Sequence, residues 1–161
     1  MNKVSDLISE SKEIMKLTEN WQFRQKGQDS WLPAKVPGSV HTDLLANQQV
    51  NDPFYGKNEL DQQWIDKQDW EYETTFDVPD KMWEHSNIEL VFEGLDTYGD
   101  VYLNGKHILE TNNMFRSWKA DAKSILKKEN NKLTVRFHSP VKVDIPKLKA
   151  LGYDLPASND H

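Results

Sequence analysis

The chain has 161 residues, 37% of them hydrophobic, with six tryptophans and a formal net charge of −6 at pH 7. This length favours one domain with a substantial core, while the acidic balance argues against nucleic acid as a partner. The absence of cysteine excludes disulfides and thiolate metal sites. No apolar run approaches the roughly 18 residues of a transmembrane helix, so no membrane partner is expected.

The N-terminal part is expected to contain a tail, a strand and a helix. Residues 1–13 lack the apolar core of a signal peptide and are predicted to form a tail, ahead of one β-sandwich domain over residues 14–161. Trp21 and Phe23 alternate with polar residues, which predicts a strand. Ser39 is placed to cap a short helix over residues 40–46.

Residues 51–64, with the sequence NDPFYGKNELDQQW, are expected to form a long irregular loop. Loops of this length inside a domain are usually functional or disordered. Three aromatic residues in the segment argue against disorder. The loop is therefore a candidate functional segment.

The clearest strand signals lie in residues 69–109. Every second residue from Trp70 to Val78 is apolar or threonine, and acidic residues predominate between them, which is the period of a half-buried strand. Further strands are expected at residues 88–93, 97–103 and 106–109. Asn104-Gly105 predicts a hairpin turn, because both central residues of a type I′ turn need positive φ.

The C-terminal part gives fewer signals. Residues 120–128 are compatible with a short helix, and alternation predicts a strand at residues 132–137. From Pro140 onward no clean period is present, and the domain is expected to be cut short at its C-terminal end. Many short strands with one or two short helices predict an all-β fold, and we favour a jelly-roll-like antiparallel β-sandwich.

No motif assigns a catalytic, metal or cofactor site. The sequence contains neither glycine-rich phosphate-binding motif, and its five histidines stand in no metal-ligand spacing. Glycoside hydrolysis needs two carboxyl groups flanking the scissile bond, but most of the 26 Asp and Glu residues fall on polar strand faces. The sequence therefore predicts no catalytic residue, no metal and no cofactor in this chain.

Several stretches resemble the sugar-binding domain of glycoside hydrolase family 2. The resemblance covers residues 17–161, and the shared pattern includes Trp70-Glu71-Tyr72 with Phe76, then Leu90, Phe92, Gly94 and Asp96, then Val101-Tyr102-Leu103-Asn104-Gly105, and then Asn131, Leu133 and Val135. The stretches VPGSVHTDLL (36–45) and NDPFYGKNE (51–59) are similar to the β-mannosidase branch, which includes exo-glucosaminidases.

The resemblance implies a galactose-binding-domain-like jelly roll, followed in the parent enzyme by immunoglobulin-like domains and a (β/α)₈ barrel. Two glutamates on that barrel would hydrolyse terminal non-reducing β-mannose with retention and without a cofactor, and the present chain alone would be inactive. The family's Gly-Trp-Asp-Trp-Gly-like loop, which completes the mannose pocket, is absent here, so no substrate-contacting residue is carried over. The resemblance favours a periplasmic or secreted location.

The partners implied are carbohydrate, as β-mannosides acting through the full enzyme, and the barrel of the same polypeptide. We predict that the loop over residues 51–64 forms the interface to that barrel or lies near the sugar. Its candidate residues are Phe54, Tyr55, Asn58, Glu59 and Trp64.

Two alternatives remain at this stage. The first is a free-standing carbohydrate-binding module, which should show a row of exposed aromatic residues on one sheet face; the outward positions of the strands are mostly charged or threonine instead. The second is the same domain of an exo-β-glucosaminidase or a β-galactosidase.

Overall fold

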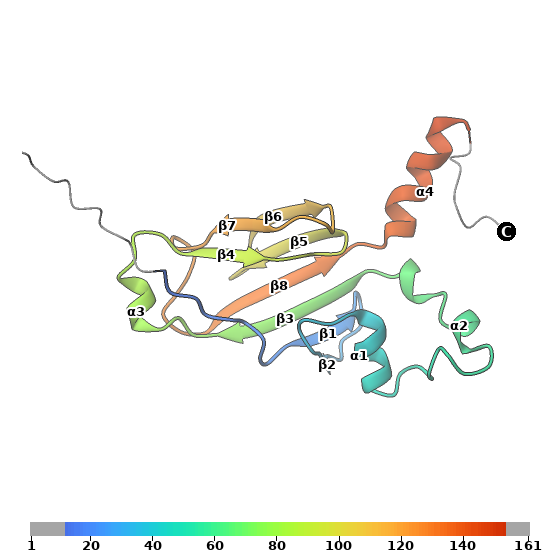
Figure 1. Ribbon diagram of the computed structural model, residues 1–161, viewed down its shortest axis with the longest axis horizontal. Helices are drawn as coiled ribbons and strands as arrows, with labels where there is room; N and C mark the ends of the chain where they lie inside the picture. Colours follow the sequence, from blue (N-terminus) through green and yellow to red (C-terminus); the bar gives the residue numbers. More distant parts are fainter. Residues whose placement is uncertain (1–11, 154–161) are drawn as a thin grey trace, which may run out of the picture.

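Two antiparallel sheets form the body of the molecule in the computed structural model, which describes residues 12–153 (Figure 1). Most of the predicted N-terminal tail, residues 1–11, lies outside the described residues, as do residues 154–161. Within the described part, Glu13 forms an ion pair with Lys81, with 2.7 Å between the charged atoms.

The larger sheet has six strands in the order β2-β1-β3-β8-β5-β6. Their bounds, in that order, are Leu32–Pro33, Gln22–Gln25, Trp70–Phe76, Asn131–Phe137, Tyr98–Leu103 and Lys106–Asn112. The smaller sheet pairs β4 (Glu89–Phe92) with β7 (Trp118–Asp121). The central strands β3 and β8 are thus joined although they are far apart in the sequence.

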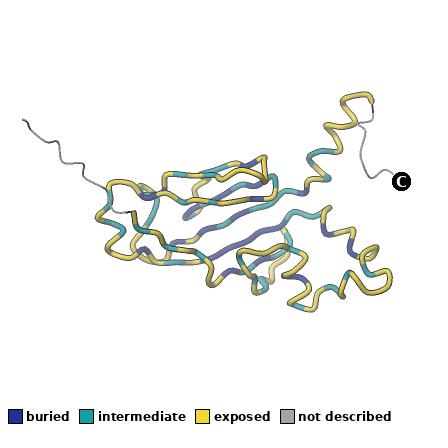
Figure 2. Tube along the Cα trace, viewed as in Figure 1, coloured by how far each residue is buried: buried dark blue, intermediate teal, exposed yellow. Residues whose placement is uncertain are grey.

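The core lies on one face of the six-stranded sheet. The register places Phe23, Tyr72, Val135 and Val101 side by side across four strands, and all four are buried. Leu90 and Phe92 of β4 pack against this core from the second sheet. The buried residues follow the central strands in Figure 2. The observed fold confirms the all-β sandwich predicted from the strand alternation.

Within residues 12–153, four α-helices and one 3₁₀ helix form between the strands or, for α4, after the last strand. They are α1 (Val40–Ala46), α2 (Asn58–Asp61), η1 (Ile65–Lys67), α3 (Asp80–Trp83) and α4 (Pro140–Leu151). In Figure 1, α1, α2 and α4 lie at one end of the sandwich, and α3 lies at the other. We call the end that carries α1, α2, η1 and α4 the helical end.

Local signals in the sequence located several elements correctly. The predicted helix coincides with α1, and the Ser39 side chain accepts a hydrogen bond from the Thr42 amide as its N-cap. The predicted hairpin is confirmed, since Asn104 and Gly105 have φ values of 52° and 81°. The four longest strands, β3, β5, β6 and β8, all fall within two or three residues of their predicted ranges.

Other elements differ from the prediction. No helix forms at residues 120–128: β7 ends there and a turn follows, in which the Asn131 side chain binds both the amide and the carbonyl of Lys127. More helices form than the one or two expected, and the longest, α4, begins at Pro140. Proline fits the first turn of a helix, where its missing N–H costs nothing, and the Ser139 side chain caps α4.

Candidate functional site

The loop over residues 51–64 is folded by its own polar groups. One Asp52 carboxylate oxygen accepts the Phe54 amide at 2.9 Å, and the Asp52 carbonyl accepts the Asn58 side-chain amide at 2.7 Å. Gly56 takes a φ of 65° at the turn that precedes α2. This closed turn holds the Phe54 and Tyr55 side chains away from the protein, with exposed fractions of 97% and 79%.

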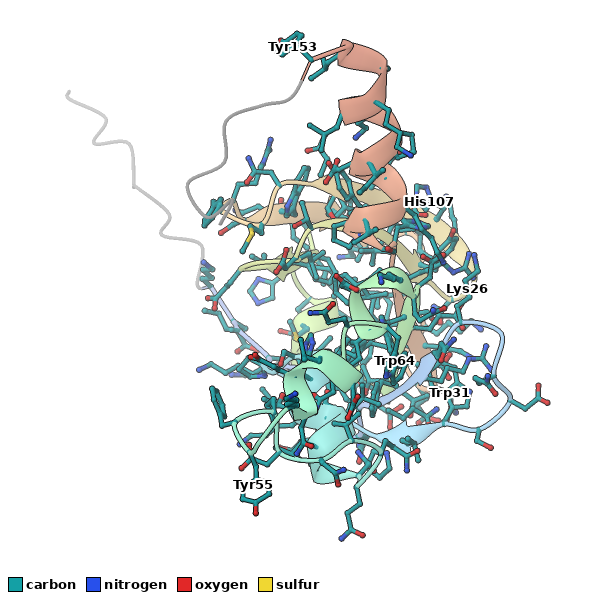
Figure 3. All side chains as sticks on the ribbon, turned by 90° about the vertical axis from the view of Figure 1, so that its right-hand side faces the viewer. Lys26, Trp31, Tyr55, Trp64, His107 and Tyr153 are labelled. Carbon is teal, nitrogen blue, oxygen red and sulfur yellow. The ribbon has the colours of Figure 1, made fainter. Side chains whose placement is uncertain are left out.

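The base of the loop is anchored to the core. Gln62 is buried and donates its side-chain amide to the Asn51 carbonyl at 2.7 Å, which ties the two ends of the loop together. The Trp64 ring lies 6.0 Å from the ring of buried Trp70, whose indole N–H donates to the Ile65 carbonyl. The loop therefore has a fixed base and an open tip (Figure 3).

A polar surface pocket of about 170 Å³ lies between the base of this loop and the segment after α1. We call it the loop pocket, and its lining residues are Gln49, Val50, Asn51, Asn58, Asp61, Gln62 and Trp64. The structure thus brings two of the predicted site residues, Asn58 and Trp64, into one pocket. Phe54, Tyr55 and Glu59 are exposed and lie outside its lining.

No sequence pattern singles out the other lining residues of the loop pocket. Gln49 and Val50 precede the loop, while Asp61 and Gln62 belong to a run of polar residues with no periodic pattern. The only signal was the density of amide side chains around Trp64, and that signal does not show which amides share a cavity.

A buried carboxylate joins α1 to the sheet at the same end of the molecule. The Asp43 carboxylate accepts the Tyr72 hydroxyl at 2.8 Å through one oxygen and the Lys35 amide at 3.0 Å through the other. Burial raises the pKa of Tyr72, and the hydrogen bond to the Asp43 carboxylate raises it further. Tyr72 therefore remains a hydroxyl donor, and α1 is held in one position against β3.

The outer face of the larger sheet carries a charged network. Glu71 lies between two arginines on neighbouring strands: its carboxylate accepts Nε of Arg24 and Nε of Arg136, each at 2.9 Å. Glu71 was expected on the polar face of its strand, and it lies there, but its exposed fraction is only 4%. The long arginine side chains cover it, which alternation alone does not reveal.

We expect acid to weaken the fold through Glu71. Burial would raise the pKa of Glu71, but the hydrogen bonds and charges of Arg24 and Arg136 outweigh burial and leave the pKa below 4.5. A pKa lowered by folding stabilises the native state above the unfolded pKa, and this stabilisation is lost as the pH falls through the folded value. Glu71→Gln should therefore cost about 1–2 kcal/mol at pH 7, and progressively less below pH ~4.5.

Urea unfolding of both proteins from about pH 7 to about pH 3 measures this difference. The matched control is Glu89→Gln, because Glu89 is an exposed strand carboxylate 3.7 Å from Lys119 and should contribute little. If Glu71→Gln lowers the free energy of unfolding by the same amount at every pH in this range, the pKa of Glu71 is not lowered by folding.

A second cleft, of about 280 Å³, lies between the β5–β6 hairpin and α4. On its wall, the Asp100 carboxylate contacts Nε2 of His138 at 2.7 Å and Nε2 of His107 at 3.0 Å. Burial would raise the pKa of Asp100, but the two histidine contacts lower it overall. The Tyr98 hydroxyl donates to Asp144 at 2.6 Å and thereby links the sheet to α4.

Apolar side chains are exposed at the helical end of the molecule. In α2 and α4, Leu60, Ile145, Leu148 and Leu151 have exposed fractions between 41% and 57%. α4 buries none of its residues. Figure 3 faces this end and shows Tyr55, Trp64 and Tyr153 on it. In that view Tyr55 lies at the far side from Tyr153, so the exposed loop tip and the exposed residues of α4 are separate features of this end.

Neither a metal centre nor a membrane span is apparent in the described part of the chain. Residues 12–153 contain no group of three or more His, Asp or Glu side chains arranged to hold a metal ion. None of the helices formed by these residues has both the length and the apolar character that crossing a bilayer requires.

The chain is similar to proteins that act on glycosides. The sequence profile of the family described as "Glycosyl hydrolase 2 galactose-binding domain-like" matches residues 21–161. "Beta-mannosidase B" of Thermothelomyces thermophilus is 41% identical over 129 residues, which cover 78% of this chain and 15% of that protein. "Beta-mannosidase A" of Emericella nidulans is 42% identical over 107 residues, which cover 66% of this chain and 11% of that protein.

Solved structures of glycosidases also match most of this chain and a small share of their own length. A β-D-mannosidase from Dictyoglomus thermophilum matches with a TM-score of 0.87 and 44% identity, over 92% of this chain and 18% of that one. A β-D-glucuronidase from the same organism matches with a TM-score of 0.57 and 20% identity, over 76% of this chain and 19% of that one, which is a likeness of fold alone. The chain spans less than a fifth of each of these proteins.

Proposed function

This chain belongs to the galactose-binding-like domain family of glycosyl hydrolase 2, and on that basis we propose that it is the N-terminal β-sandwich domain of a β-mannosidase. The parent enzyme would hydrolyse terminal non-reducing β-mannose residues. The match to the β-D-mannosidase of D. thermophilum, at 44% identity and a TM-score of 0.87, carries this proposal. Catalysis would reside in the parent's barrel, while this domain supplies one wall of the substrate pocket.

The proposed contact with the barrel is the open tip of the 51–64 loop. Phe54 and Tyr55 together expose two large aromatic side chains at the end of a turn whose polar groups are already satisfied. Exposed apolar groups gathered on one surface are typical of an interaction site. Leu60 of α2, within the same loop, is also exposed.

Replacing both Phe54 and Tyr55 with serine in the parent enzyme should therefore weaken it. We expect kcat/KM for an aryl β-mannoside to fall about tenfold or more, or the melting temperature to fall by several degrees, because a buried aromatic contact at an interface contributes about 2 kcal/mol. In the 161-residue chain alone the same change should leave stability within about 0.5 kcal/mol, since both side chains are exposed there.

The control for this pair is Val91→Ser, which removes an exposed side chain of β4 in the smaller sheet. If the double serine variant of the parent keeps both its kinetics and its thermal stability, the loop tip is not the interface. If the 161-residue variant itself unfolds, the effect is structural.

The function is tested by hydrolysis of aryl β-mannoside, β-glucosaminide and β-galactoside by the 161-residue chain and by the parent protein. Activity of the parent on the mannoside, beside an inert chain, is the expected result. Activity of the parent on one of the other substrates would instead identify it as an exo-β-glucosaminidase or a β-galactosidase. Activity of the chain itself would overturn its non-catalytic role.

The free-standing binding module is the weaker interpretation. The exposed strand faces described above carry a charged network rather than a row of aromatic residues, with Arg24, Glu71 and Arg136 at its centre. A module that binds glycan through a sheet face would need flat apolar surface at those positions.

A further inference from the structure

We propose that His138 is a pH-sensitive anchor of helix α4: it holds the start of the helix against the larger sheet while its ring carries a proton, and it loosens the helix when that proton is lost. His138 lies between Phe137, the end of β8, and Ser139, the N-cap of α4. The helix buries none of its own residues, so apolar packing does not fix it. Its position therefore depends on polar contacts.

The His138 ring lies between two carboxylates on different parts of the sheet. Its Nε2 is 2.7 Å from the Asp100 carboxylate of β5, and its Nδ1 is 4.0 Å from the carboxylate of Asp69, which precedes β3. A neutral imidazole has one N–H donor and one lone pair, whereas the imidazolium has a donor at both nitrogens. Only the protonated ring therefore attracts both carboxylates, because the neutral ring turns a lone pair toward one of them.

Asp69 connects this pair to the first turn of α4. One oxygen of its carboxylate accepts the Ser139 amide at 3.0 Å and lies 3.5 Å from Nζ of Lys142. The Ser139 side chain in turn accepts the Lys142 amide at 3.2 Å as the cap of the helix. A change in the attraction between His138 and Asp69 therefore acts directly on the residues that begin the helix.

Both carboxylates remain ionised in the range where histidine titrates. Burial would raise the pKa of Asp69, but the hydrogen bond from the Ser139 amide and the nearby positive charges lower it overall. Burial would also raise the pKa of Asp100, but its contacts with His138 and His107 lower it overall. Between about pH 5 and 8 the group that changes charge is thus the imidazole. A contact that needs this proton is complete at low pH and is lost as the pH rises through the titration of the ring.

The neighbouring charges leave this contact distinct from the others. His107 of β6 shares the Asp100 carboxylate at 3.0 Å but has no hydrogen bond to α4 within residues 12–153. The Tyr98 hydroxyl donates to Asp144 at 2.6 Å independently of His138, so the helix should loosen at its first turn without detaching. The titratable and charged side chains around His138 are Lys26 after β1, Asp69 before β3, Tyr98 and Asp100 of β5, His107 and Glu110 of β6, Arg136 of β8, and Lys142, Asp144 and Lys147 of α4.

The test is NMR of the ¹⁵N-labelled 161-residue chain from about pH 5 to about pH 8, with the His138 ring nitrogens and the α4 amides followed in the same samples. We expect the Val143 amide, which donates to the Ser139 carbonyl at 3.1 Å, to titrate together with the ring. Its protection factor against hydrogen exchange should fall about threefold or more as the ring loses its proton, which is the order expected for one partly exposed ion pair.

Three variants separate the anchor from its neighbours. His138→Gln should abolish the pH dependence of the Val143 protection factor. Asp69→Asn should abolish it too, because asparagine keeps an acceptor for the Ser139 amide but has no charge. His107→Gln is the matched control, since it removes the other histidine on Asp100, and it should leave the pH dependence within about twofold of the wild type.

The anchor is overturned if the Val143 amide does not follow the titration of the ring, if His138→Gln or Asp69→Asn keeps the wild-type pH dependence, or if His107→Gln abolishes it. If His138→Gln does not fold, Asp69→Asn decides the question alone. None of these measurements involves hydrolysis of a mannoside, so the anchor and the proposed enzymatic function stand or fall separately.

Discussion

Replacing Phe23 with alanine is expected to lower the free energy of unfolding by about 3–5 kcal/mol, which is a large part of the stability of an ordinary domain. The Phe23 ring is completely buried and lies 6.0 Å from the Trp70 ring and 5.5 Å from the Tyr72 ring, centroid to centroid. Truncation removes these contacts and leaves a cavity that rigid aromatic neighbours cannot close. Urea unfolding followed by tryptophan fluorescence measures the loss.

Phe54→Ala is the matched control for Phe23→Ala, because it makes the same chemical change at a side chain that is 97% exposed. It should change the free energy of unfolding by less than about 0.5 kcal/mol. Equal effects of the two changes would mean that Phe23 does not occupy the core of the folded protein.

Replacing Asn131 with alanine is expected to cost about 2–4 kcal/mol although it removes only one small polar side chain. Asn131 is completely buried. Its side-chain oxygen accepts the Lys127 amide at 2.8 Å and the Asn104 side-chain amide at 3.0 Å, and its own amide donates to the Lys127 carbonyl at 2.7 Å. Alanine would leave these groups without their partner, and the turn before β8 would lose its closure.

The control for Asn131 is Asn112→Ala at the end of β6. The Asn112 side chain is exposed and makes no hydrogen bond within the described residues, so its loss should cost less than about 0.5 kcal/mol. Chemical denaturation of both variants, with the slope checked against the wild type, gives the comparison. If the Asn131→Ala protein is as stable as the Asn112→Ala protein, the hydrogen bonds of the Asn131 side chain do not stabilise the fold.

Sequence patterns predicted elements whose stability is local or whose burial follows a simple period. The Asn104-Gly105 turn was predictable because its backbone angles restrict the residues allowed. Helix α1 was predictable because Ser39 supplies a cap next to the helix. The alternation in β3 correctly placed Trp70 and Tyr72 in the core.

Features that depend on distant partners were not predictable. The burial of Glu71 depends on two arginines, which lie 47 and 65 positions away in the sequence. The Asp43–Tyr72 hydrogen bond likewise joins a helix and a strand that only the fold brings together. Strand β7 was not predicted, although Trp118 and Ala120 alternate with Lys119 and Asp121, and it is its pairing with the distant strand β4 that defines it.

The candidate site was predictable as a segment and not as a cavity. The length and aromatic content of residues 51–64 pointed to the loop, but they gave Phe54 and Trp64 equal weight. The structure separates an exposed tip from a polar pocket at the base, because Gln62 and Asn51 close the loop between them. The roles of the predicted site residues stay predictions.

The strand order has a consequence for synthesis on the ribosome. β3 is a central strand, yet its partner β8 is made last, and the contact between Glu71 and Arg136 spans 65 positions. Until β8 emerges, the nascent chain presents β3 with one unpaired edge, and an unpaired strand edge favours aggregation. Pairings between such distant segments also make folding slow. The domain should therefore acquire protease resistance late, only once residues beyond Phe137 have left the exit tunnel.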